Sequence, residues 1–259
     1  MVKEKFLRVD ELLVKNGLAT SRTTAQVLII AGKVRASADD VVDKPSRKFP
    51  LDQNFLIDSP PRFVSRAGEK LAHFIETFHI EVRDRLCLDV GASTGGFSDC
   101  LLQNGAKTVV GIDVGHGQLH YKLQKNPRMI NLEKVNARTV SSNMLPFNKF
   151  DIIVLDLSFI SLKLVLENIW KFLIHNGILV ALVKPQFEAG KSEANKHAGV
   201  IKDRLLQEKI VNAMVKFSLD TLENSIFFGR LDSPILGTDG NREFLLGMKK
   251  LIPNERNNL

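Results

Sequence analysis

The chain has 259 residues, of which 44% are hydrophobic; this is enough to bury one large domain, or a large and a small one, and too much for a disordered chain. The formal net charge of +7 and the pI near 9.4 favour a polyanionic partner such as nucleic acid. No apolar run approaches the roughly 20 residues of a membrane-spanning helix, and the N-terminus lacks a secretory signal pattern, so we expect a cytoplasmic protein.

The first sixty residues predict a small α+β domain. Residues 8–16 and 20–31 predict two short helices that end at Gly17 and Gly32, with Thr20 or Ser21 as the cap of the second. Strand-like segments follow at 33–36 and 54–57. Residues 1–35 carry 7 basic and 3 acidic side chains, whereas residues 36–60 carry 3 basic and 5 acidic ones. A charge run is most often a solvated face, but here the positive charge is concentrated on the two helices and the turn after them.

The remainder of the chain alternates strands and helices. Two prolines, Pro60 and Pro61, mark a linker that we place at 61–66. Apolar strand patterns occupy 86–90, 109–113, 152–155, 178–183, 225–228 and 243–248, and helical patterns occupy 162–173 and 205–217. This alternation predicts an α/β domain over 67–252 whose sheet is mostly parallel and Rossmann-like, with helices on both faces. A polar tail follows at 253–259.

The run LCLDVGASTGGF at 86–97 predicts a strand, a tight glycine loop and a helix. This order is typical of nucleotide-binding α/β domains, because glycines let the backbone approach a ligand and the helix N-terminus presents free N–H groups. Asp89 precedes the first glycine by two residues, and Asp113 ends the next strand. The spacing differs from the G-x-G-x-x-G of dinucleotide dehydrogenases and resembles the first motif of methyltransferases that use S-adenosylmethionine (SAM).

Charged residues stand at the ends of two further strands. Asp156 follows the strand at 152–155, and Lys184 follows the strand at 178–183. Ligands in open α/β sheets collect beyond the carboxyl ends of the strands. A lone charged residue at a strand end is most often a solvated terminus. Here two strands each end in a charged residue after an uncharged apolar run, and this pattern favours a functional site and a solvated edge about equally.

Six segments resemble the TlyA family, whose members are known both as haemolysins and as ribosomal RNA methyltransferases. They are VSRAGEKL at 64–71, LDVGASTGGFSDCLL at 88–102, VGIDVGHGQL at 110–119, LDLSFISL at 155–162, LVKPQFEAG at 182–190 and NREFLL at 241–246. The resemblance runs in order over nearly the whole chain. The first sixty residues are similar to the small RNA-binding domain first described in ribosomal protein S-four, and the remainder is similar to the FtsJ-like ribose methyltransferases.

The resemblance implies transfer of a methyl group from SAM to a ribose 2′-hydroxyl of ribosomal RNA, with cytidine as the expected nucleoside. It implies a catalytic set of Lys70, Asp156, Lys184 and Glu243. The hydroxyl is a poor nucleophile that needs a base or a strong orienting group, and a lysine is a base only where part of it is neutral. A nearby cation and burial favour the neutral amine, and adjacent carboxylates oppose it. We expect Lys70 to oppose Lys184, with both carboxylates holding them and Lys184 facing the hydroxyl.

The same resemblance assigns binding residues. The methionine end of SAM is expected along the glycine loop, at Gly91, Ala92, Ser93, Gly95, Gly96 and Phe97. Asp89 either contacts the amino group of SAM or only braces the loop. Asp113 is expected to bind the ribose hydroxyls, and Asn136, after the third strand, the adenine. RNA phosphates are expected at Arg8, Arg22, Lys33 and Arg35, with Arg62 and Arg66 of the linker.

The sequence gives weaker support to other functions. His116 and His120 are spaced i, i+4, but no Glu stands between them as in a zinc protease motif and no third ligand is evident, so no metal is expected. A membrane-active haemolysin is an alternative, as is an RNA-binding module whose methyltransferase fold has lost catalysis; the intact four-residue set speaks against the second. A nicotinamide dehydrogenase is disfavoured by the loop spacing.

Overall fold

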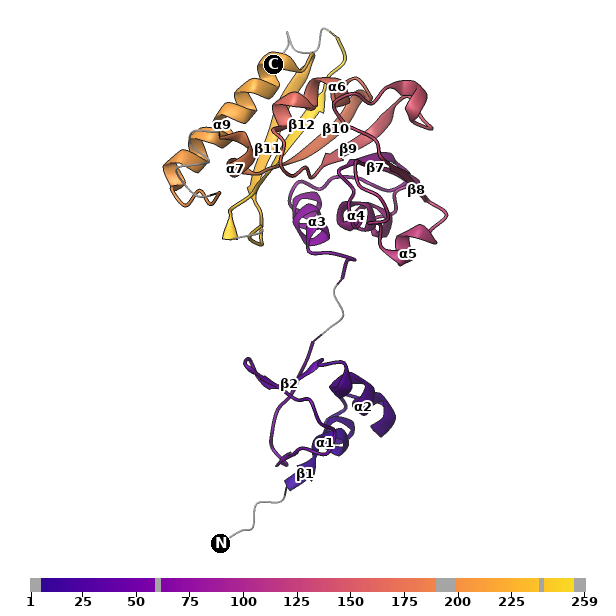
Figure 1. Ribbon diagram of the computed structural model, residues 1–259, viewed down its shortest axis with the longest axis vertical. Helices are drawn as coiled ribbons and strands as arrows, with labels where there is room; N and C mark the ends of the chain where they lie inside the picture. The colour runs from indigo at the N-terminus through magenta and orange to yellow at the C-terminus, as the bar shows by residue number, and fades with distance from the viewer. Residues whose placement is uncertain (1–5, 59–61, 190–198, 238–239, 254–259) are drawn as a thin grey trace. The chain divides into compact units, whose positions relative to one another are not determined.

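The computed structural model describes residues 6–58, 62–189, 199–237 and 240–253 (Figure 1). The chain divides into two compact units, Met1–Pro61 and Arg62–Leu259. Most of the expected polar tail, residues 254–259, lies outside the described residues. No helix in the described part of the chain is long and apolar enough to cross a membrane.

The first unit packs two helices against two small antiparallel sheets. Its elements are β1 (Phe6–Arg8), α1 (Val9–Lys15), α2 (Arg22–Ile30), β2 (Val34–Ser37), β3 (Asp40–Val41), β4 (Lys48–Pro50) and β5 (Leu56–Ile57). The sheets have the orders β1-β4 and β3-β2-β5. Ser21 caps α2 by accepting a hydrogen bond from the Thr24 backbone N–H at 3.1 Å. The core under both helices includes Leu12, Leu13 and Ile29.

A buried carboxylate joins the two helices of this unit. Asp10 is fully buried and accepts hydrogen bonds from Arg8 at 3.0 Å, Arg22 at 3.1 Å and Gln26 at 2.9 Å. Burial alone would raise the pKa of Asp10, but the bonds from Arg8, Gln26 and Arg22 outweigh it and hold that pKa well below its usual range. The ion pairs therefore tie α2 to the start of α1.

The second unit is a seven-stranded sheet with the order β11-β12-β10-β9-β6-β7-β8. The elements are α3 (Ala67–Thr77), β6 (Leu86–Val90), α4 (Gly96–Gln103), β7 (Thr108–Asp113), α5 (Tyr121–Gln124), β8 (Met129–Glu133), η1 (Ser142–Met144), β9 (Phe150–Leu155), η2 (Leu162–Leu164), α6 (Leu166–Trp170), β10 (Leu173–Val183), α7 (Pro185–Glu188), α9 (Arg204–Thr221), β11 (Ser225–Asp232) and β12 (Phe244–Lys250). Strands β8, β7, β6, β9 and β10 are parallel to one another. Strand β12 is antiparallel to β10, and β11 is antiparallel to β12, so β12 is the strand that runs opposite to the others. The sheet is Rossmann-like and mostly parallel, as the sequence predicts.

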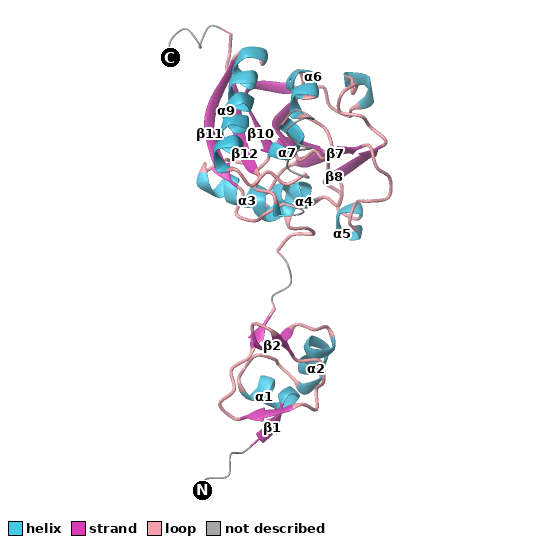
Figure 2. Cartoon of the chain, turned by 60° about the vertical axis from the view of Figure 1, so that its left-hand side comes forward, coloured by secondary structure: helices cyan, strands magenta, loops and turns pink. Residues whose placement is uncertain are grey.

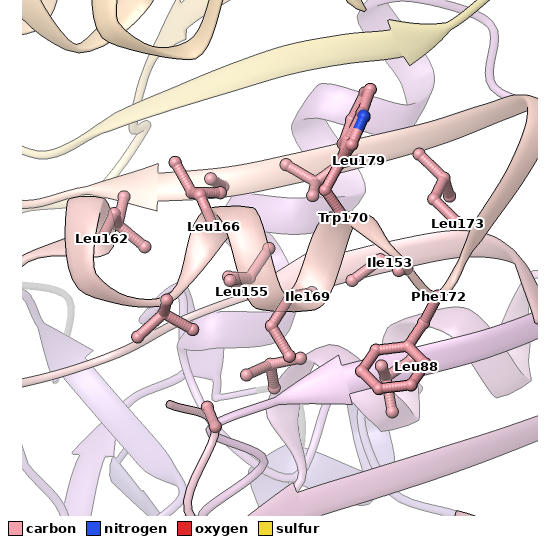
Figure 3. Close-up of a cluster of buried hydrophobic side chains, with 14 of the residues drawn as sticks. Leu88, Ile153, Leu155, Leu162, Leu166, Ile169, Trp170, Phe172, Leu173 and Leu179 are labelled. Carbon is pink, nitrogen blue, oxygen red and sulfur yellow. The ribbon is translucent and has the colours of Figure 1, made fainter. Parts of the chain in front are cut away.

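Successive residues of each strand point to opposite faces of this sheet, which gives the unit two cores. Leu88, Ile153 and Leu179 pack toward α6 and α9 (Figure 3). Cys87, Ile152 and Val180 pack on the other face, toward α3 and α4 (Figure 2). Both cysteines are free and buried.

The helix predicted over residues 162–173 is wrong in length. The structure has η2, then the short helix α6, and Leu173 already begins β10. Val165, with φ of −124°, interrupts the helix between η2 and α6. The periodic apolar residues Leu162, Leu166, Ile169 and Leu173 are nevertheless all buried in one core (Figure 3).

The part of the expected linker from residue 62 onward packs on the second unit. Phe63 is buried in its core, and the Val64 backbone N–H donates to Asp99 Oδ2 at 2.8 Å. Gly68 is required beneath Phe63, because a Cβ there would lie 2.4 Å from the aromatic ring. The chain is thereby fixed directly before α3.

We predict that Asp10→Asn selectively destabilises the first unit, because it removes a buried charge from between Arg8 and Arg22. The expected loss is about 1.5–3 kcal/mol. Since the folded-state pKa of Asp10 is lowered, its contribution is present above the unfolded-state pKa, near 4, and is lost as the pH falls below that value.

Hydrogen exchange of the α1 and α2 amides measures this effect. Trp170 is the single tryptophan and lies in the second unit, so its fluorescence serves as an internal control. Equal protection of α1 and α2 in the variant and the wild type would contradict the prediction.

Candidate active site

The glycine loop between β6 and α4 lies against the end of β9. Gly91 has a φ of +86°, and a Cβ there would lie 2.5 Å from the Asp156 carbonyl oxygen, so only glycine fits. Ser93, with φ of +48°, donates its backbone N–H to Asp113 Oδ2 at 2.9 Å. The Gly115 N–H donates to Asp113 Oδ1 at 2.7 Å. These two bonds fix the orientation of the Asp113 carboxylate.

Two adjoining pockets open at this edge of the sheet. The smaller, about 150 Å³, includes the expected cofactor residues Asp89, Gly91, Ala92, Ser93, Gly96 and Phe97 in its wall, together with Asp156 and Lys184. The larger, about 570 Å³, includes Asp113 and Asn136. Gly91, Ser93, Asp156 and Ser158 line both pockets. One continuous site therefore leads from Asp113 to Lys184.

Gly95, which we expected in the cofactor wall, lines neither pocket. Its φ is +92°, and a Cβ there would lie 2.2 Å from Leu123 Cδ1. The glycine is needed for the left-handed backbone turn and for the close packing of α5, rather than for direct approach to a ligand.

Asp89 is a fully buried carboxylate in the wall of the smaller pocket. Its Oδ2 accepts from Ser98 Oγ at 2.7 Å, whereas Oδ1 has no hydrogen-bond partner among the described residues. Burial raises the pKa of Asp89 to about 7; the bond from Ser98 opposes this rise, and the nearby Asp156 and Asp113 carboxylates add to it. An unpartnered buried oxygen is costly, so this atom is suited to a cationic or N–H donor in the pocket.

Lys184 forms the first of two lysine–carboxylate pairs. Its Nζ lies 2.7 Å from Asp156 Oδ1 and donates to Ser158 Oγ at 2.9 Å. Lys184 is 9% exposed, and it lies in the wall of the smaller pocket beside the glycine loop. The amine is therefore fixed by two groups of the β9 loop, which we define as residues 156–161.

Lys70 and Glu243 form the second pair. The Lys70 Nζ donates to Glu243 Oε2, and the two residues are 8% and 4% exposed. Gly237 makes room for this carboxylate, because a Cβ at that position would lie 2.2 Å from Glu243 Oε1. Both pairs join residues that lie on different elements.

Strand register explains why the four residues converge. Val183 of β10 pairs with Phe244 of β12 in antiparallel register, so the next step sets Lys184 beside Glu243. Ala181 of β10 pairs with Leu155 of β9 in parallel register, and Asp156 follows directly. Lys70 comes from α3, which packs against α4 and β12. The set expected from the sequence therefore meets at one edge of the sheet, as two ion pairs.

Sequence reasoning missed two polar residues of the site, Ser158 and Glu188. Ser158 bonds to Lys184, and Glu188 accepts hydrogen bonds from Ser161 Oγ and the Leu162 backbone N–H. Both lie inside segments that we had singled out, LDLSFISL and LVKPQFEAG. The only available signal was that each is a polar residue inside one of these two segments.

The residues expected to bind RNA are mostly engaged in ion pairs. Arg8 and Arg22 hold Asp10, Arg35 holds Asp58 at 3.0 Å, and Arg62 holds Glu76 at 3.1 Å. Arg62 and Arg66 are exposed and Lys33 is half-buried. A guanidinium has five N–H donors, so the paired arginines that reach solvent retain donors for phosphate.

His116 and His120, the two histidines spaced i, i+4, each contact groups of the protein. Among the described residues no cluster of three potential metal-ligating side chains exists. His116 Nδ1 pairs with Glu133, which also accepts the Gly117 N–H at 2.8 Å. His120 caps α5 by accepting from the Lys122 N–H.

Comparison with known proteins gives the family. Residues 63–250 match the family model described as FtsJ-like methyltransferase. The chain is 40% identical to Hemolysin A of Brachyspira hyodysenteriae over 92% of its own length and 98% of that protein. It is 41% identical to the 16S/23S rRNA (cytidine-2′-O)-methyltransferase TlyA of Mycobacterium tuberculosis, over 93% of this chain and 89% of that one.

A solved structure from Streptococcus thermophilus that carries the name hemolysin is 37% identical and superposes with a TM-score of 0.71, covering 95% of this chain and 89% of that one. The expected family resemblance is confirmed over both units. The chain belongs to the TlyA family of FtsJ-like methyltransferases, and it is an enzyme with a Rossmann-like methyltransferase fold.

Proposed function

We propose that this protein transfers a methyl group from SAM to the ribose 2′-hydroxyl of a cytidine in ribosomal RNA. The observation that carries the proposal is the position of Lys184, in a pocket continuous with the one that contains Asp113. The relative in Mycobacterium tuberculosis is named for this reaction on 16S and 23S rRNA. The membrane-active and non-catalytic alternatives give no role to the two ion pairs and the paired pockets.

The residues around the two pockets fit SAM. The unpartnered Oδ1 of Asp89 would bind the ammonium group of the methionine portion, in the pocket that Gly91 and Ala92 also line. Asp113 and Asn136, in the larger pocket, would hold the ribose and the adenine. When bound, SAM supplies the electrophilic methyl group.

The charged residues supply the acid–base chemistry and the alignment. Lys184, in its neutral form, would take the proton of the 2′-hydroxyl as the oxygen acquires the methyl group. Asp156 and Ser158 hold the Lys184 amine in place, and Asp156 stabilises the ammonium group that results. Lys70, paired with Glu243, places a second cation at the same sheet edge. Alignment of oxygen and methyl contributes to the rate together with proton removal.

The first unit is proposed to dock on ribosomal RNA. Its positive charge is concentrated in residues 1–35, and phosphate contacts are expected from Arg8, Arg22, Lys33 and Arg35. Phosphate contacts are also expected from Arg62 and Arg66, which precede α3 in the second unit. The partner is a ribosomal subunit, and we propose a cytoplasmic location because the substrate is there.

Lys184→Ala is predicted to lower the rate of methyl transfer by about 10²–10⁴ while SAM affinity stays nearly unchanged. Lys184→Arg is predicted not to restore activity, because a guanidinium stays protonated and cannot accept the proton. Single-turnover transfer of labelled methyl to ribosomal subunits gives the rate, and calorimetry gives the SAM affinity. An active Lys184→Arg enzyme would leave Lys184 only a positioning role.

Asp89→Asn is predicted to weaken SAM binding and to stabilise the ligand-free protein at pH 8. The folded-state pKa, about 7, is above the usual value, so the stability contributed by the neutral carboxyl is lost as the pH rises through 7. Asparagine stays neutral and can still accept the Ser98 bond. The loss in SAM binding should be about 1.5–3 kcal/mol, the scale of a charged hydrogen bond.

Calorimetry and thermal unfolding at pH 6 and pH 8 measure the two effects of Asp89→Asn separately. Wild-type affinity for SAM should rise with pH through about 7 as Asp89 ionises. If Asp89→Asn binds SAM as tightly as the wild type, the carboxylate only braces the loop. If NADH binds and SAM does not, the proposed function is wrong.

Deletion of residues 1–60 is predicted to leave SAM binding intact and to abolish methylation of ribosomal subunits, because the RNA contacts lie in the deleted unit. In the full chain, RNA affinity should fall with rising salt, since phosphate contacts release counterions. Calorimetry with SAM is the control for correct folding of the remaining chain. Full-rate methylation of subunits by the truncated protein would refute the docking role.

A further inference from the structure

The β9 loop, residues 156–161, is held in a strained conformation beside the active site. Phe159 in this loop has a φ of +64° and is 91% exposed. A left-handed backbone at a bulky residue is strained and persists only where surrounding contacts enforce it. Asp156 and Ser158, which hold Lys184, lie in this same loop.

The helix α7 holds the loop at both ends. At the first end, Lys184 contacts Asp156 and Ser158 at 2.7 and 2.9 Å. At the far end, Glu188 Oε2 accepts from Ser161 Oγ at 2.6 Å, and Oε1 accepts from the Leu162 N–H at 2.7 Å. Lys184 is the N-cap residue of α7 and Glu188 is its last residue, so this short helix links the two ends of the loop.

An aromatic contact joins the middle of the loop to α7. The ring of Phe187 lies 5.3 Å from the ring of Phe159. Burial raises the pKa of Glu188, and its bonds to Ser161 and Leu162 oppose that rise. Among the described residues, Glu188 makes no ion pair with Lys184. The contacts that connect Glu188 to the lysine therefore run through the β9 loop.

We propose that Glu188 is a positioning residue for methyl transfer. By fixing Ser161 and Leu162, it sets the position of Asp156 and Ser158, and these two residues set the position of the Lys184 amine. The inference rests on the proposed function, in which Lys184 faces the acceptor hydroxyl. A displacement of about 1 Å in a reacting group lowers a rate by about 10²-fold, so the loop need move only slightly for the effect to be measurable.

Three variants separate geometry from charge. Glu188→Ala removes both bonds. Glu188→Gln retains them, because the amide oxygen accepts the Leu162 N–H and the amide NH₂ donates to Ser161 Oγ. Ser161→Ala removes only one of the two bonds.

Asp151→Ala is the matched control for a general loss of stability. Asp151 also accepts a backbone N–H, that of Leu86 at 2.9 Å. It lies near the beginning of β9, whereas the active site lies beyond the end of that strand. This variant should unfold at a lower temperature and keep the wild-type kcat.

Steady-state methylation of ribosomal subunits tests the catalytic part of the proposal. Glu188→Ala should lower kcat by about 10–100-fold, with a smaller change in the KM for SAM. Ser161→Ala should fall between Glu188→Ala and the wild type, and Glu188→Gln should stay close to the wild type. The proposal is overturned if Glu188→Ala keeps the kcat of Asp151→Ala, or if Glu188→Gln is as impaired as Glu188→Ala.

Hydrogen exchange of residues 157–163 tests the contact itself without any substrate. Exchange should be about 10-fold or more faster in Glu188→Ala and unchanged in Glu188→Gln. Unchanged exchange in Glu188→Ala overturns the proposal even if no subunit is methylated. Absence of methylation by the wild type would count against the proposed function, and the exchange result would still decide whether Glu188 fixes the loop.

Discussion

The pairing of β10 with β9 on one side and β12 on the other is the constraint on which the active site depends. The parallel pair places Asp156 next to the end of β10, and the antiparallel pair brings Glu243 back to the same end. Lys184 stands at that end, between the two carboxylates. Because β12 runs opposite to its neighbours, its first residues, rather than its last, lie at the edge where ligands bind.

Burial of charged residues at this edge is costly unless each charge has a partner. The structure meets this demand with one carboxylate for each lysine. Apolar residues would fill the same volume without the cost of removing charges from water, so stability does not explain the pairs. The proposed transfer of a proton gives them a role. Asp89 departs from this rule, since one of its oxygens is buried without a partner among the described residues. The proposed ammonium group of SAM would supply that partner.

Strand-end reasoning on the sequence located Asp113, Asp156 and Lys184, because an acid or a lysine at the end of an apolar strand marks the carboxyl edge of a parallel sheet. The glycine-loop motif located Asp89. Strand-end reasoning could not predict the ion pair between Lys70 and Glu243. That contact joins α3 to the residue directly before the antiparallel strand β12, 173 residues further along the chain. The basic residues of the first unit show a second limit. Counting charges indicated an excess of positive charge in residues 1–35. It could not show that Asp10 pairs with Arg8 and Arg22, or that Asp58 pairs with Arg35.

Nucleoside analysis of ribosomal RNA after incubation of purified subunits with the enzyme and SAM carrying a labelled methyl group tests the central claim most directly. The account predicts that all the label is recovered as 2′-O-methylcytidine, and that the Lys184→Ala enzyme leaves the RNA unlabelled. Label on a base, or equal labelling by the Lys184→Ala enzyme, would contradict it.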